Sequence, residues 1–349
     1  MKNKVKNNRS PWIRRTAVVI GCLLAGALVF AAYLLMGPNT RSFGDKKYFY
    51  IPTGSNYQNV LEGLQEQGII SSPATFNLVA KRLDYPARVK AGRYEIKKGM
   101  SNLEIIRMLR SGRQSPVKLV INKLRLKEDF IRLVAGNLEA DSASLKAILE
   151  DQVYLRQFGL DTNTVMCAVM PNTYEFYWNT SAGKVFDKLE SAYNIFWNES
   201  RKAKAQALGL SPAEVTTLAS IVEEETNKND EKPVIASVYL NRLRTGMKLG
   251  ADPTVKFALK NFALKRIWGA HTEFDSPYNT YRYSGLPPGP ICTPSARSID
   301  AVLTPVVSDY LYFCAKWDFS GYHAFATNYK DHMDNARAYQ KALNARGIK

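Results

Sequence analysis

The stretch that decides the fold is SPAEVTTLASIVEEET, residues 211–226. Ser211 can cap a helix, the proline after it suits the first helical position, and Glu214 completes a capping box. A helix is therefore expected to begin here. At 100° per residue, one face of that helix is apolar. The side chains on this face belong to Val215, Leu218, Ile221 and Val222.

Glu225 is the acidic residue that stands out in this helix. It falls in the middle of the apolar face, whereas Glu223 and Glu224 point elsewhere and are expected to be solvated. A carboxyl group on an apolar face loses its solvation, which raises its pKa and suits a general acid at neutral pH. The nearby helix C-terminus does not stabilise an anion. From geometry alone, Glu225 is either a catalytic acid or one half of a satisfied buried pair.

The net charge and the histidine and cysteine content limit which ligands and partners the protein is expected to bind. The chain has 349 residues, enough for two or three compact units, and a net charge of +17. Such a surface favours polyanions: nucleic acid, anionic lipid or an acidic cell-wall polymer. Three histidines argue against a histidine-rich metal site, and no metal or cofactor is expected. The cysteines lack zinc-like spacing; apart from Cys22 they are expected to be buried free thiols, or to include one disulfide. They are Cys167, Cys292 and Cys314.

The N-terminal segment predicts a membrane anchor. Residues 1–15 form a basic tail with six lysines and arginines and no acid, and residues 16–36 carry no charge. An apolar helix of that length spans a bilayer core and exceeds the apolar region of a signal peptide. The basic flank predicts a cytoplasmic N-terminus, with everything after the helix outside. The predicted location is the inner (cytoplasmic) membrane, as a single-pass protein, which places the basic bulk away from nucleic acid.

The remaining sequence predicts two α+β parts after a linker at 37–46. A small module at 47–115 is expected to bind a polymer or to act as a spacer, and a larger mixed domain occupies 116–349. The module should contain strand, helix, helix, strand and helix in that order. Its elements are expected at 47–52, 57–67, 73–83, 92–96 and 101–112.

In the larger domain, helices are expected to precede a loop-rich region with short strands. A strand should lie at 117–121. The loops after residue 246 are rich in proline, glycine, tyrosine and asparagine, and are either rigid turns or the wall of a groove. In a groove, tyrosine rings would stack on sugars and amides would pair with hydroxyl or acetamido groups. Helices are expected at 127–138, 142–158, 183–208, 211–226 and 232–244.

Several motifs together resemble the YceG-like family of endolytic murein transglycosylases (the MltG family). Their order and spacing carry the resemblance: ASIVEEET at 219–226, DPT at 252–254, SPYNTY at 276–281 and GLPPGPI at 285–291. YLYF at 310–313 and GYHAF at 321–325 strengthen it. Two departures are MPNT at 170–173, where the family usually has Phe-Pro-Asp-Thr, and Gly-Tyr-His at 321–323, where it often has Gly-Gly-His.

The resemblance implies a membrane-anchored enzyme that faces the cell wall, with a LysM-like module before an α+β catalytic domain. Such enzymes cut nascent peptidoglycan strands internally, at the β-1,4 bond between N-acetylmuramic acid (MurNAc) and N-acetylglucosamine (GlcNAc). They leave 1,6-anhydro-MurNAc ends and limit strand length next to peptidoglycan synthases. The catalytic acid of the family is the last acid of its motif, which corresponds to Glu225.

Five further residues are candidates for substrate binding, each with a structural alternative. A loop role is the alternative for His323, simple packing for Ser220 and solvation for Glu223. Asn279 and Tyr281 could equally be scaffold. Asp252, which precedes a proline, is expected to cap a helix rather than to act as a second acid. The candidates are Asn279, Tyr281, Glu223, Ser220 and His323.

The predicted mechanism needs one carboxyl group. A hydrolytic glycosidase generally needs two, whereas a lytic transglycosylase can use a single residue first as acid and then as base. The main alternative is a non-catalytic membrane protein that binds peptidoglycan or holds synthases together. A nucleic-acid-binding protein is suggested only by the charge, and the membrane segment and the lack of a base-reading module argue against it.

Overall fold

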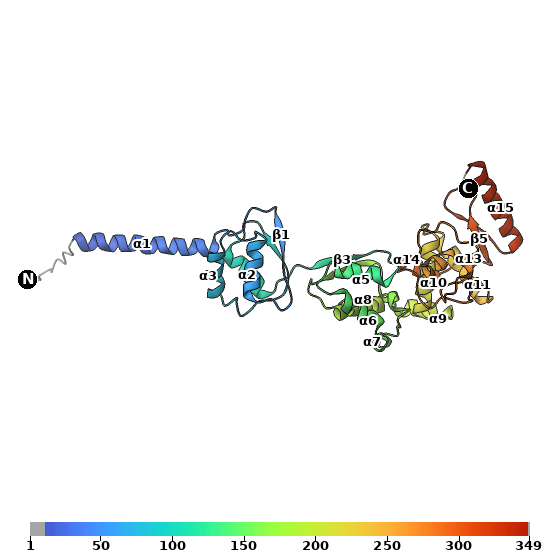
Figure 1. Cartoon of the computed structure of the whole chain (residues 1–349), viewed down its shortest axis with the longest axis horizontal. Coiled ribbons are helices and arrows are strands. Elements are labelled where there is room, and N and C mark those ends of the chain that lie inside the picture. The colour runs from blue at the N-terminus through green and yellow to red at the C-terminus, as the bar shows by residue number, and fades with distance from the viewer. Residues whose placement is uncertain (1–10, 348–349) are drawn as a thin grey trace, which may run out of the picture. The chain divides into compact units, whose positions relative to one another are not determined.

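The computed structural model describes residues 11–347 and shows a mixed α+β protein with an apolar N-terminal helix (Figure 1). The chain divides into two compact units. The first unit runs to Val117 and includes residues 177–179, and the second contains residues 118–176 and those from Thr180 onward. Most of the predicted basic tail, residues 1–10, lies outside the described residues.

The N-terminal helix α1 spans Pro11–Met36 and so begins five residues before the predicted segment at 16–36. Within it, Trp12–Met36 is long and apolar enough to cross a membrane. Arg14 and Arg15 lie in the first turns of the helix, because an arginine is a good helix former even where the apolar run has not begun.

The first unit packs three helices against a two-stranded sheet. Strand β1 (Lys46–Ile51) pairs antiparallel with β2 (Gly92–Lys97), so that Phe49 faces Tyr94. The predicted capping box at Ser101 is present, and Gly112 ends the following helix in the left-handed conformation (φ 74°). The helices are α2 (Tyr57–Glu66), α3 (Pro73–Arg82) and α4 (Asn102–Ser111).

The second unit is mainly helical. Strand β3 (Val117–Ile121) pairs with β4 (Asn172–Phe176), and β5 (Tyr312–Ala315) pairs antiparallel with β6 (His323–Ala326). The helices are α5 (Lys127–Ala135), α6 (Ser142–Glu150), α7 (Gln152–Arg156), the 3-10 helix η1 (Val165–Ala168), α8 (Ala182–Phe196), α9 (Glu199–Ala207), α10 (Pro212–Glu225), α11 (Lys232–Arg244), α12 (Asp252–Ala258), α13 (Ala270–Glu273), α14 (Ala296–Leu303) and α15 (Tyr329–Ala345).

Three predictions about helices were wrong. The helix expected at 183–208 is two helices, because Asn198 caps a new one by accepting from the Arg201 backbone N–H. The helix expected at 142–158 is likewise divided, and Asp151 caps its second part. The region after 246 contains four further helices. The longest, α15, was missed because Leu343 is its only buried residue, so its apolar periodicity is weak.

Helix α10 lies at the centre of the second unit, in contact with α9, α11, α12 and α14 (Figure 1). The capping box of Ser211 with Glu214 is present as predicted. Every residue from Val215 to Val222 is buried, so the helix is enclosed on all sides and not on one face only. Its threonines tolerate this burial because their hydroxyl groups donate to carbonyls one turn earlier.

Candidate active site

Glu225 is the last residue of α10 and opens into a cavity of about 280 Å³ within the second unit. Its Oε1 accepts a hydrogen bond from the Tyr239 hydroxyl at 2.5 Å. Tyr239 comes from α11, whose side chains pack against α10. The cavity is lined by Glu225, Tyr239, Arg242, Gly250, Asp252, Tyr281, Phe313, Cys314, Ala315 and His323.

Burial raises the pKa of Glu225 to about 7. Loss of water around the carboxyl group penalises its charged form, and the Asp252 charge adds to this effect. The Tyr239 hydrogen bond and the charges of His323 and Arg242 oppose it. A carboxyl group with a raised pKa in a cavity is a candidate for proton transfer near neutral pH.

Asp252 belongs to the same cavity. It is the first residue of α12, and the cap position is Ala251, so the prediction that Asp252 caps this helix was wrong. Its Oδ1 instead accepts from the Tyr281 hydroxyl at 2.5 Å. The helix can begin without a side-chain cap because Pro253 follows and removes one unpaired N–H group. The cavity thus holds two carboxyl groups, each bonded to a tyrosine.

His323 also lines the cavity, and Glu231 fixes its ring. The His323 Nδ1 lies 2.8 Å from Glu231 Oε2, and its backbone N–H donates to the other oxygen at 2.6 Å. Glu231 is itself buried, at 4% exposure. His323 therefore combines the predicted loop role with a place at the site.

Arg242 brings a positive charge to the cavity. Its guanidinium donates to the backbone carbonyls of Leu311, at 2.7 Å, and Leu249. Among residues 11–347, no carboxylate forms an ion pair with it. A guanidinium that is held by carbonyls keeps its charge uncompensated, so Arg242 can attract an anion.

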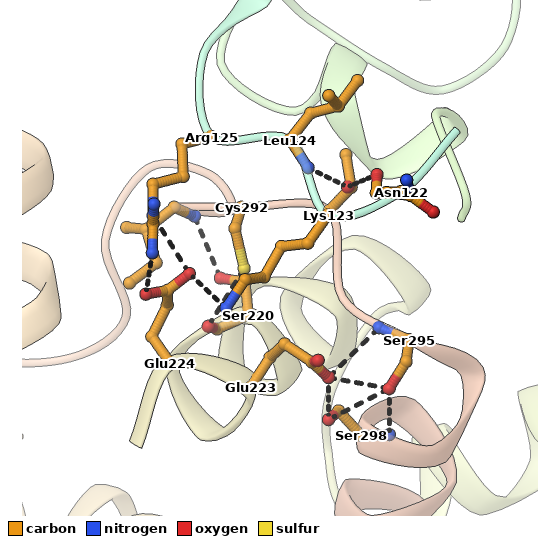
Figure 2. A network of polar contacts seen from close by, with 12 residues as sticks. Asn122, Lys123, Leu124, Arg125, Ser220, Glu223, Glu224, Cys292, Ser295 and Ser298 are labelled. Atoms are coloured by element: carbon orange, nitrogen blue, oxygen red, sulfur yellow. Dashed lines mark hydrogen bonds and ion pairs between the residues drawn. The ribbon is translucent and has the colours of Figure 1, made fainter. Parts of the chain in front are cut away.

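Glu223 and Glu224 are not solvated, and that prediction was wrong. Glu223 Oε2 accepts from Lys232 Nζ at 3.0 Å, and Lys232 is 5% exposed. The same oxygen accepts from two serine hydroxyls (Figure 2). Glu224 accepts two bonds from Arg125, at 2.8 and 3.2 Å, and pairs with Lys123 at 3.0 Å. The serines that bond Glu223 are Ser295 and Ser298.

Three of the predicted substrate-binding residues, Asn279, Ser220 and Glu223, do not line the cavity. Asn279 is fully buried and uses both amide hydrogens on the carbonyls of Thr272 and Phe274, while its oxygen accepts from the Tyr281 N–H. It holds the loop that carries Tyr281. Ser220 is fully buried too, and its hydroxyl accepts from the Ile291 N–H at 2.9 Å. Glu223 likewise acts within the protein.

The four cysteines are free thiols, so the alternative with a disulfide was wrong. Cys167 and Cys292 are buried as expected, whereas Cys314 is half-buried and lines the cavity. Within residues 11–347, no group of three or more histidine, cysteine or acidic side chains is arranged to hold a metal ion.

The model of the YceG-like family matches residues 49–338, which include every residue of the cavity. The chain belongs to the YceG-like family.

Curated relatives of this YceG-like chain are named endolytic murein transglycosylase. One, from Bacillus subtilis (strain 168), is 28% identical over 92% of each chain. Another, from Streptococcus pneumoniae (strain ATCC BAA-255 / R6), is 28% identical over 91% of this chain, which spans 63% of that relative's length. A crystal structure of a yceG-like protein from Listeria monocytogenes is 29% identical, with a TM-score of 0.55, and the match covers 83% of this chain and 99% of that one.

Sequence reasoning missed Tyr239 and Arg242, which line the YceG-like cavity, and Glu231, which holds His323 there. Tyr239 and Arg242 are three residues apart on the predicted helix at 232–244, so they lie on one face. That spacing was a usable signal. The helix at 232–244 directly follows the one that ends in Glu225, so two polar side chains on one of its faces are candidates to contact this glutamate. Glu231 gave no such signal, since its partner lies 92 residues away.

Proposed function

We propose that this protein is a membrane-anchored endolytic lytic transglycosylase of peptidoglycan. It cuts the β-1,4 bond between MurNAc and GlcNAc in nascent strands and leaves 1,6-anhydro-MurNAc ends, which limits strand length. The observation that carries the proposal is Glu225, a carboxyl group at the cavity whose pKa is about 7. The names of the curated relatives support the same reaction class.

Glu225 acts first as the acid. In its protonated form it donates to the glycosidic oxygen that leaves with GlcNAc, and the C1–O bond breaks. Positive charge develops at C1 of the muramoyl sugar. The Asp252 carboxylate, oriented by Tyr281, provides a negative charge in the same cavity to stabilise it, together with the acetamido group of the sugar itself.

Glu225 then acts as the base. Its carboxylate takes the proton of the C6 hydroxyl of the same muramoyl sugar, and the C6 oxygen forms a bond to C1. The enzyme regains its proton and no water is consumed, so the products together have the composition of the substrate. Tyr239, Arg242 and His323 favour the carboxylate between the two steps, because each lowers the pKa of Glu225.

The parts of the chain have separate proposed roles. Helix α1 is the single-pass anchor in the cytoplasmic membrane, with the N-terminus in the cytoplasm and the rest on the cell-wall side. The module at 47–115 is LysM-like and holds the glycan strand, and the domain at 116–349 is catalytic. Peptidoglycan synthases are the proposed protein partners, because strand cutting has to follow strand synthesis.

The test uses the full chain in detergent with purified glycan strands, and mass spectrometry of the released ends. We expect anhydro ends from the wild type and roughly 10³-fold fewer from Glu225→Gln, the scale of a lost general acid. Glu175→Gln, which changes an exposed glutamate of β4 in the same unit, should behave as the wild type.

The other outcomes have defined meanings. Reducing ends from the wild type would mean hydrolysis, and Asp252 would then be the second carboxyl group, since it lines the same cavity. Strands that bind to the wild type but stay uncut would overturn the proposal in favour of a non-catalytic protein that binds peptidoglycan or holds synthases together.

A further inference from the structure

A groove of about 560 Å³ lies in the first unit, where the end of α1 meets α3. Five of its seven lining residues are apolar, and the other two are cations. Leu78 is 61% exposed although it belongs to the wall. The groove has no part in the proposed reaction. It is lined by Ala31, Leu34, Leu35, Leu78, Val79, Lys81 and Arg82.

A polar network fixes the end of α1 to the first unit. The Leu34 carbonyl would normally accept from the N–H four residues on, but residue 38 is a proline and has none. Asn102 of α4 supplies the missing donor at 3.3 Å. Its oxygen accepts from the Asn39 amide at 2.6 Å, and both asparagines are buried. The groove is therefore a built feature of the junction.

The charges of α1 set the depth of this groove in a bilayer. Arg14 and Arg15 stay at the headgroups on one side, because a charge in the hydrocarbon core is costly. The 21 uncharged residues that follow, 16–36, rise about 31 Å, which matches the roughly 30 Å of hydrocarbon. Ala31–Leu35 then lie at the far edge of the hydrocarbon layer, and α3 lies beside them.

At that depth the two ends of the groove meet different parts of a lipid. The apolar wall, including Leu78, faces acyl chains, and the last turn of α3 presents Lys81 and Arg82 to the headgroup layer. Both cations are exposed, and neither has an ion pair among the described residues. The lining of the groove contains no acid.

We propose that this groove binds an anionic phospholipid of the surrounding bilayer. One acyl chain lies along α1 and Leu78, and the phosphate lies between Lys81 and Arg82. The inference rests on the proposed membrane anchor but not on the glycan reaction. It gives the first unit a lipid contact that holds it at the membrane surface, in addition to the covalent link through α1.

Native mass spectrometry tests this with the full chain in mixed micelles of equal phosphatidylglycerol and phosphatidylcholine. We expect the wild type to retain phosphatidylglycerol preferentially. Lys81→Gln with Arg82→Gln should reduce that preference by roughly 30-fold, about fivefold for each cation near an anionic headgroup. Lys97→Gln with Lys98→Gln, which removes two exposed cations of the same unit, should retain it.

Leu78→Gln tests the apolar half, and should weaken retention of both lipids while the preference between them stays. Equal phosphatidylglycerol preference in the wild type and the Lys81/Arg82 variant would overturn the proposal. So would a photo-crosslinking residue at position 78 that captures another protein instead of lipid in cells. Glycan cleavage by the same samples is read in parallel, so that a failed reaction with intact lipid preference counts against the proposed function alone.

Discussion

Three consecutive glutamates end α10, and their side chains have different surroundings. Glu223 and Glu224 face ion pairs and hydroxyl groups, whereas Glu225 faces the cavity and a tyrosine. Burial would raise the pKa of all three. For Glu223, bonds from Ser298, Ser295 and Lys232 outweigh burial, and the pKa is lowered.

For Glu224, bonds from Arg125 and Lys123 likewise outweigh burial and lower its pKa. The pKa of Glu225 rises because its main partner is a neutral hydroxyl and its cations are more distant influences. The contrast teaches that pairing, not burial alone, decides which carboxyl group holds a proton at neutral pH. The paired glutamates anchor the end of the helix, and the unpaired one remains available for proton transfer.

The largest change in the free energy of unfolding is expected when the ion pair between Glu223 and Lys232 is broken. Glu223→Gln leaves the Lys232 charge buried without its carboxylate, and should lower the free energy of unfolding by about 3–5 kcal/mol. Urea unfolding measures this. Adding Lys232→Met should recover part of the loss, because the stranded charge is then removed. A loss below 1 kcal/mol in the single variant would mean that the pair does not hold α10.

A substitution of Glu225, which faces the cavity, is expected to raise the free energy of unfolding instead of lowering it. The pKa of Glu225 in the folded protein is raised to about 7 from an ordinary value of 4.5. The folded state therefore binds the proton more tightly, so this group makes stability fall as pH rises from about 4.5 to about 7 and then level off. Glu225→Gln removes the penalty, and should be more stable than the wild type at pH 8 by about 3 kcal/mol.

Thermal and urea unfolding at pH 4 and pH 8 check this prediction. At pH 4 the two proteins should differ little, because the carboxyl group is protonated in both the folded and the unfolded state. A Glu225→Gln variant that is less stable at pH 8 would indicate that Glu225 is one half of a satisfied buried pair, the alternative that the sequence left open.

A smaller effect is expected when the hydrogen bond from Tyr239 to Glu225 is removed. Tyr239→Phe removes the donor that favours the Glu225 carboxylate, so the pKa of Glu225 should rise further. The alkaline limb of the pH–activity profile should move up by about one pH unit, the scale of one hydrogen bond to a charged group. Tyr283→Phe is the matched control, since its hydroxyl bonds Asp275 on an exposed loop. An unshifted limb would contradict the role of Tyr239.

The sequence predicted the parts of this contrast that depend on local spacing. The Ser211 capping box follows from residues within one helix and is present. Glu225 lines the cavity, and its role as the acid stays a prediction. The partners of the other two glutamates were not predictable, because Arg125 lies 99 residues from Glu224 and Ser295 lies 72 residues from Glu223. Acidic residues at a helix end look solvated unless the tertiary fold is known.

The smallest change in the free energy of unfolding is expected for the partly exposed ion pair between Lys123 and Glu224. Lys123 is 34% exposed and shares Glu224 with Arg125, so Lys123→Gln should lower the free energy of unfolding by under about 1 kcal/mol. Arg125→Gln should cost more, because it removes two hydrogen bonds from a carboxylate that is only 14% exposed. Urea midpoints of the two variants give the ranking. If Lys123→Gln cost as much as Glu223→Gln, charge alone would hold the helix end. If the costs follow the expected order instead, the buried hydrogen bonds to Glu223 and Glu224 are what hold the end of α10, and they thereby orient Glu225 toward the cavity.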